Sequence, residues 1–183
     1  MQTMSKKLLY KMELEMFKVD DIVMYGTNGV CKITEIEEKN LIGTKKTYLV
    51  LKPFNGDKST YFVPVDNENL LSKMRKLLSK DEINRLIDSM PYEKVLWIDN
   101  ERDRKQCYKK ILAEGNHSEL IRMIKALHCK KKSLEEKGKK LHMSDERFFK
   151  DAEKILYNEF QYVLNLSEED VLSYIFDRIE KSN

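Results

Sequence analysis

The spacing of apolar residues changes once along the chain, and this change limits the folds that the chain can adopt. Up to Val65 the apolar residues form short runs that are rich in β-branched and aromatic side chains and end at turn residues. From Ser79 onward they recur every three or four residues, which is the spacing of one face of an α-helix. The change of pattern predicts an α+β protein with two domains, a small β domain followed by a helical bundle.

Four short runs in the first part of the chain have the composition of β-strands. Asn28-Gly29 and Asn55-Gly56 are turn signals, because asparagine and glycine readily adopt positive φ angles. The polar stretch 37–44 is expected to be a connection. This many strands in so short a segment predict a small Tudor- or SH3-like barrel across residues 16–72. The predicted strands are 22–25, 30–36, 47–51 and 59–65.

The second part of the chain carries signals for about five α-helices across residues 73–183. Ser79 and Glu82 have the spacing of a capping box at the start of the first helix. A second helix is expected from about Trp97 to Glu114, where Gly115 ends it. The other three are expected to begin near Asn116, Ser144 and Ser167.

Several classes of protein are disfavoured by the sequence. No apolar run approaches the roughly 20 residues that cross a membrane, and no secretory signal is present. Cys31, Cys107 and Cys129 are odd in number and widely spread, which fits reduced thiols in a cytoplasm. No histidine, cysteine or carboxylate has the spacing of a metal site or a catalytic set. We expect a cytoplasmic protein that is not an enzyme and has no metal or cofactor.

The first residues of the chain stand apart from the rest. Met16 is a second start position, and the residues that follow it lead directly into the first predicted strand. We therefore expect residues 1–15 to be an extraneous or disordered extension.

Positive charge is concentrated in the middle of the chain. Between Arg102 and Lys154 there are sixteen basic and nine acidic residues, a net charge of +7. Lys130, Lys131 and Lys132 form one of the densest basic runs. Such a segment suits either a solvated helix end or contact with the phosphates of a nucleic acid.

Trp97, the only tryptophan, stands just before a run of basic side chains. It suits a ring that packs between helices or a wedge that enters nucleic acid. From pattern alone the packing role is favoured. Composition and pattern thus indicate a binding protein and leave its partner open.

Motifs in both halves, in this order, resemble the CarD/CdnL family of bacterial transcription regulators. The first half carries Phe17-Lys18-Val19, Tyr48-Leu49-Val50-Leu51-Lys52 and Val63-Pro64-Val65. The second half carries the Trp97 segment, with Arg102 and Arg104, and the helix end at Gly115. The resemblance implies an N-terminal Tudor-like domain that docks on the β subunit of RNA polymerase. It also implies a C-terminal helical domain that touches promoter DNA at the upstream edge of the transcription bubble.

The resemblance implies a role for individual residues at the DNA. Trp97 would be a wedge in the minor groove, with phosphate contacts that do not depend on sequence. The candidate phosphate contacts are Arg102, Arg104, Lys105, Lys109, Lys130, Lys131 and Lys132.

On the polymerase side, Lys39 corresponds to a basic residue of the family. The second basic docking position of the family is occupied here by Tyr61 or Phe62, next to Pro64. We expect a monomer, with a dimer through an exposed strand edge as the alternative. The competing function is a protein–protein adaptor whose helical domain binds a protein instead of DNA.

Overall fold

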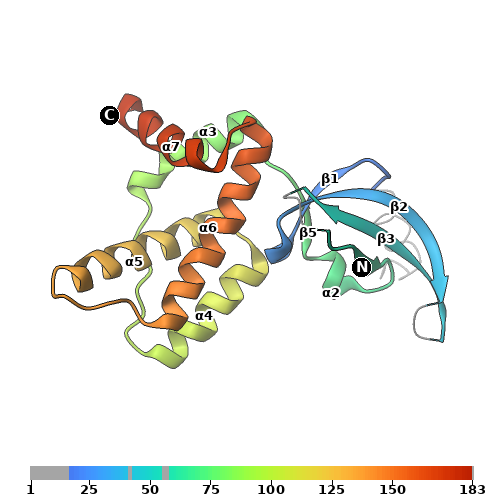
Figure 1. Cartoon of the computed structure of the whole chain (residues 1–183), viewed down its shortest axis with the longest axis horizontal. Helices are drawn as coiled ribbons and strands as arrows, with labels where there is room; N and C mark the ends of the chain where they lie inside the picture. Colours follow the sequence, from blue (N-terminus) through green and yellow to red (C-terminus); the bar gives the residue numbers. More distant parts are fainter. Residues whose placement is uncertain (1–16, 41–42, 55–57, 183) are drawn as a thin grey trace, which may run out of the picture. The chain divides into compact units, whose positions relative to one another are not determined.

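The computed structural model describes residues 17–40, 43–54 and 58–182. The extension predicted for residues 1–15 lies outside them. The chain divides into two compact units, Met1–Leu77 and Leu78–Asn183. Figure 1 shows strands in the first unit and helices in the second, which confirms the predicted α+β architecture. The predicted boundary after Ser72 falls just before the last strand of the first unit.

The first unit is built on one antiparallel sheet of five strands in the order β4-β3-β2-β1-β5. The last strand, β5, pairs with the first, so β4 and β5 are the two edges of the sheet, and Figure 1 shows that its long strands are curved. A short 3-10 helix, η1, follows β1, and a single helical turn, α2, precedes β5. The elements are β1 (Ile22–Tyr25), η1 (Gly26–Asn28), β2 (Val30–Asn40), β3 (Lys45–Pro53), β4 (Tyr61–Pro64), α2 (Glu68–Leu71) and β5 (Met74–Lys76).

Strands β2 and β3 form a longer hairpin than the sequence predicted. The stretch 37–44 was expected to be a connection, but β2 continues to Asn40 and β3 starts at Lys45. The pairing runs without a break from Ile36↔Leu49 to Asn40↔Lys45. The polar side chains of this stretch are exposed or half-buried, so their polarity reflects the solvent-facing end of a hairpin.

The core of the first unit lies on one face of the sheet, in agreement with the alternation of strand residues. A register shift between Ile33 and Glu35 bends β2. Leu71 of α2 and Met74 of β5 complete the core. Its central members are Val23, Cys31, Ile33, Leu49, Leu51 and Val63, each at most 1% exposed.

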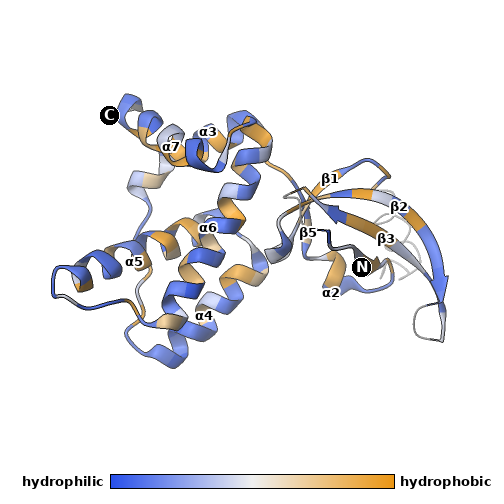
Figure 2. Ribbon diagram, viewed as in Figure 1, coloured by the Kyte–Doolittle hydropathy of each residue, from blue (hydrophilic) through white to orange (hydrophobic). Residues whose placement is uncertain are grey.

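Five α-helices and a 3-10 turn make up the second unit, as predicted for a helical bundle. Figure 2 shows their apolar residues along the faces that meet. The core joins residues of α3, α5, α6 and α7, with Ile83, Ile87 and Phe160 fully buried. The elements are α3 (Lys80–Ser89), η2 (Met90–Tyr92), α4 (Glu101–Glu114), α5 (His117–Glu135), α6 (Met143–Leu164) and α7 (Glu168–Ser182). No described helix has the length and apolar character to cross a membrane.

Capping residues set where these helices start and stop. The capping box of Ser79 and Glu82 is confirmed. The second helix starts later than predicted, because the side chain of Asn100 accepts a hydrogen bond from the backbone N–H of Asp103 and caps α4 there. Trp97 therefore lies before the helix. Gly115 ends α4 with φ 64°, a left-handed conformation that glycine adopts without strain.

Candidate functional site

The segment that carries Trp97 is fastened to α5 along its length. The ammonium group of Lys125 donates hydrogen bonds to the carbonyls of Met90, Pro91 and Glu93, at 2.9, 3.1 and 2.5 Å. The backbone N–H of Leu96 donates to the carbonyl of Arg122 at 3.3 Å. This segment has almost no regular secondary structure. These hydrogen bonds to α5 therefore fix its position and that of Trp97, which follows Leu96.

The indole ring of Trp97 is half-buried between two cations. The guanidinium of Arg104 lies 4.5 Å from the ring centre, and the ammonium of Lys130 lies 4.8 Å from it. The indole N–H donates a 3.0 Å hydrogen bond to the carboxylate of Asp99. The ring has both cation–π partners and a satisfied N–H group, so it is held in a defined orientation.

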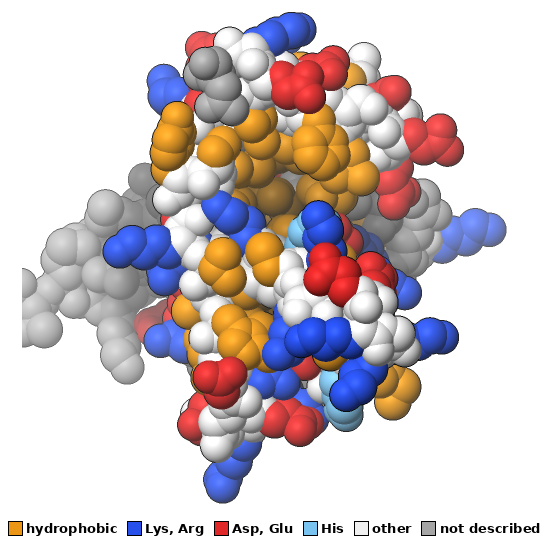
Figure 3. All heavy atoms as spheres, turned by 90° about the vertical axis from the view of Figure 1, so that its left-hand side faces the viewer, with side chains coloured by type: hydrophobic (Ala, Val, Ile, Leu, Met, Phe, Trp, Pro, Cys, Tyr) orange, Lys and Arg blue, Asp and Glu red, His pale blue; other side chains and the backbone are white. Residues whose placement is uncertain are grey.

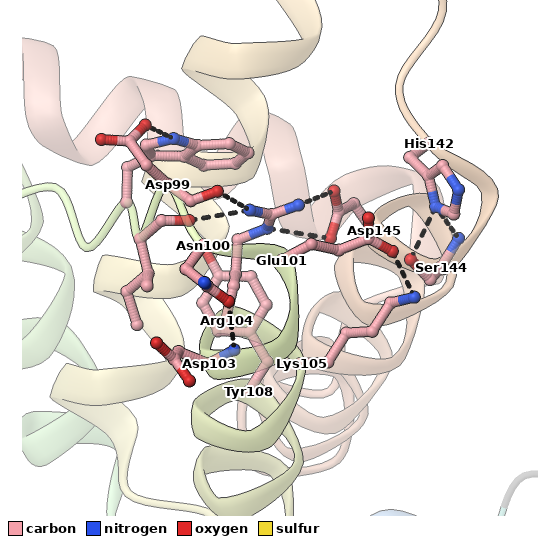
Figure 4. Close-up of polar contacts among 12 residues, drawn as sticks. Asp99, Asn100, Glu101, Asp103, Arg104, Lys105, Tyr108, His142, Ser144 and Asp145 are labelled. Carbon is pink, nitrogen blue, oxygen red and sulfur yellow. Dashed lines mark hydrogen bonds and ion pairs between the residues drawn. The ribbon is translucent and has the colours of Figure 1, made fainter.

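Arg104 does not have the surroundings of a phosphate contact, although the sequence suggested that role. The residue is only 6% exposed. Its guanidinium donates to both carboxylate oxygens of Asp145 on α6, at 3.2 and 2.9 Å, and to the carbonyls of Ile98 and Asp99. Figure 4 shows this network between the start of α4 and the start of α6. The guanidinium of Arg104 thus donates its hydrogen bonds to groups inside the protein. Its ion pair with Asp145 has a structural role.

The other predicted cations of α4 lie on a different side of that helix. At about 100° per residue, Arg102 is about 200° around the axis from Arg104. Arg102, Lys105 and Lys109 line one shallow hollow on the surface. Lys105 forms an ion pair with Glu101, and its hydrogen bond lowers the pKa of that carboxyl. The structure thus gathers these three cations and separates them from the face of α4 that carries Arg104.

Of the three lysines 130–132, only one contacts Trp97 within the described part of the chain. Lys130 lies over the indole. Lys131 lies over the ring of Phe149 at 5.8 Å and 3.6 Å from a carboxylate oxygen of Glu146. Lys132 is exposed. The candidate nucleic-acid surface therefore has two parts, the Trp97–Lys130 pair and the cationic side of α4.

The residues predicted to dock on polymerase lie mostly on the outer face of the first unit's sheet. The ammonium of Lys39 lies 4.4 Å from the ring centre of Phe62. Phe62 is 36% exposed and packs edge-on against Tyr48. Pro64 pairs with Tyr48 and shares this face. Tyr61 is the exception, because it packs on the core face against Tyr25. Phe62, and not Tyr61, is therefore the residue that accompanies Lys39.

The histidines and cysteines of the second unit do not gather at one point. His117 contacts the carboxylate of Glu159 at 2.8 Å, and His142 caps α6. Cys107 is half-buried and Cys129 is exposed. Within the described part of the chain, no three histidine, cysteine or carboxylate residues lie close enough to hold a metal ion.

Comparison with known families addresses the first unit. Residues 17–77 match the family of the CarD-like/TRCF RID domain. Domains of this family interact with the β subunit of RNA polymerase. A comparison with curated proteins finds no match.

Proposed function

We propose that this protein is a bacterial transcription regulator, acting as a monomer without catalysis. In this proposal it docks on the β subunit of RNA polymerase and stabilises the open promoter complex through contact with DNA at the upstream edge of the bubble. The observation that carries the proposal is the match of residues 17–77 to the CarD-like/TRCF RID domain. The DNA contact rests on the resemblance of the second half and on its charge.

The outer face of the sheet supports the docking step. Phe62 offers an aromatic surface, and Lys39 covers part of it with a cation. Aromatic residues that become buried on binding often contribute most of the affinity of an interface. Lys39 also forms an ion pair with Glu37, so its position above the ring is defined on two sides.

The helical unit supports contact with DNA through its charge. Arg102, Lys105 and Lys109 form a cationic surface on α4, and Lys130 accompanies Trp97. Contacts to phosphates are largely independent of sequence and weaken steeply with salt. If the protein binds the open complex more tightly than the closed complex, about 1.4 kcal/mol of difference shifts the equilibrium tenfold.

The docking step is tested by measuring the affinity of the full chain for the isolated β subunit. We expect Phe62→Ala to weaken binding about tenfold or more, equivalent to about 1.4 kcal/mol, and Lys39→Ala to weaken it less. Lys45→Ala is the matched control, because Lys45 pairs with Asn40 and so projects from the opposite face of the same hairpin. Equal affinities for wild type, Phe62→Ala and Lys45→Ala would exclude this face as the docking surface.

A second candidate function is the adaptor whose helical unit binds a protein. One observation favours it: Leu172 and Phe176 on α7 are exposed apolar residues on an acidic helix. Such a surface attracts proteins and repels DNA.

A further inference from the structure

Helix α7 presents an exposed apolar surface. Phe176 is 62% exposed and Leu172 is 45% exposed, whereas their neighbours Val171 and Ile175 are buried in the core. The helix is held firmly, because Tyr174 donates to Asn84 at 2.7 Å and Arg178 forms an ion pair with Asp88, both on α3. The two exposed side chains are thus displayed on a fixed helix.

The helical unit also carries an apolar hollow on its surface. Figure 3 shows hydrophobic side chains gathered around a depression at the level of α3 and α7, with acidic side chains along part of its border. Half-buried apolar residues of neighbouring helices pack beside the same core. Among them are Leu86 and Met90 from α3 and its C-terminus, Ile124 from α5 and Ile179 from α7. Continuous exposed apolar surface bordered by charge is typical of a site that binds another macromolecule.

The charge of α7 limits what that macromolecule can be. Arg178 is already paired with Asp88, so Lys181 is the one cation of α7 without an ion pair among the described residues. The acidic side chains of α7 that are exposed are Glu168, Glu169, Asp170, Asp177 and Glu180. Their field repels phosphates and attracts lysine and arginine.

We infer that the Leu172–Phe176 face of α7 is a docking site for a basic amphipathic segment of a protein partner. The apolar side chains of such a segment would pack against Leu172 and Phe176, and its lysine or arginine side chains would lie against Asp177 and Glu180. A helix that lays its apolar face into a groove is a common mode of recognition. The inference is independent of the proposed contact between the other end of the unit and DNA.

The test uses the full chain and two labelled helical peptides with the same pattern of leucines. One peptide carries lysine at all its polar positions, and the other carries glutamate. Fluorescence anisotropy should show micromolar binding of the lysine peptide and no binding of the glutamate peptide. Phe176→Ala, and separately the pair Asp177→Lys with Glu180→Lys, should each weaken binding about tenfold. Met143→Ala should leave it unchanged, since Met143 on α6 is 84% exposed and lies outside this face.

Three results would overturn the inference. One is equal binding of both peptides, and another is equal loss of binding in Phe176→Ala and Met143→Ala. The third is a dimer in sedimentation that Phe176→Ala abolishes, which would make a second copy of the chain the occupant. Competition of the lysine peptide by unlabelled peptide, but not by duplex DNA, would support a protein partner.

Discussion

Arg104 and Asp145 join α4 to α6 through two hydrogen bonds, of 3.2 and 2.9 Å, in a place closed to solvent. Removal of one member leaves the other charge buried without its partner. We expect Arg104→Ala to lower the free energy of unfolding by about 3–5 kcal/mol, whereas Arg102→Ala, on the exposed side of the same helix, should change it by less than about 0.5 kcal/mol. Urea titration of both variants distinguishes them. Similar stabilities would show that the pair does not hold the two helices together.

Substitution of Trp97 tests the proposed contact with DNA. In the proposed function, Trp97→Ala shortens the lifetime of the open complex about tenfold while affinity for the β subunit stays the same, an effect of about 1.4 kcal/mol. Because it is the only tryptophan of the chain, its emission can be followed without a label. Lys130→Ala should shorten the lifetime more than Lys132→Ala, since Lys130 lies over the ring. An unchanged lifetime in Trp97→Ala, with docking intact, would remove the wedge from the proposal.

Tyr108 makes the stability of the helical unit sensitive to high pH. Burial raises the pKa of its hydroxyl from 10.0 to about 12, and the hydroxyl donates to the carbonyl of Leu96. Between these two values the folded chain keeps a proton that the unfolded chain has lost. The stabilisation from this proton is therefore complete below pH 10 and is lost as the pH rises towards 12, by roughly 2–3 kcal/mol. Tyr108→Phe should remove this part of the pH dependence, as measured by urea titrations from pH 9 to 12. Parallel curves for both proteins would contradict it.

Glu159 is fully buried, and its carboxylate contacts both Leu78 and His117. One carboxylate oxygen accepts the backbone N–H of Leu78 at 2.9 Å, and the other contacts His117 at 2.8 Å. Since Glu159→Ala leaves the half-buried N–H of Leu78 without this acceptor and His117 without its carboxylate, we expect a loss of about 2–5 kcal/mol in the free energy of unfolding. Glu153→Ala is the control on the same helix, because Glu153 is only half-buried. Hydrogen exchange of the Leu78 amide should accelerate in the Glu159 variant alone.

The sequence predicted the elements better than it predicted their ends. The change of period placed four of the five strands and the five helices, whereas the short strand β5 at Met74–Lys76 was missed. The capping box at Ser79 was recognisable because both partners lie within one turn. The start of α4 was placed too early, since a helix beginning at Trp97 and one capped by Asn100 give the same apolar spacing further on. The length of the β2–β3 hairpin was missed because exposed strand residues are as polar as loop residues.

The burial of Arg104 could have been predicted from the sequence, but its ion-pair partner could not. Arg104, Tyr108 and Ile111 are spaced four and three residues apart, so the arginine shares the buried face of its helix. That spacing separates it from Arg102, which is two residues away. Its partner Asp145 is distant in sequence and looks like an ordinary acidic residue in the first turn of a helix. No local pattern identifies such a pair.

The bond between Leu78 and Glu159 has a mechanical consequence. Leu78 is the first residue of the helical unit, and its backbone is tied to α6 instead of depending on α3 alone. A pulling force applied to the chain at Leu78 would thus be transmitted to α6. This helix has 22 residues and packs against α3, α4, α5 and α7. Unfolding that starts at Leu78 would have to break its hydrogen bond to the buried carboxylate of Glu159 before α3 could unwind.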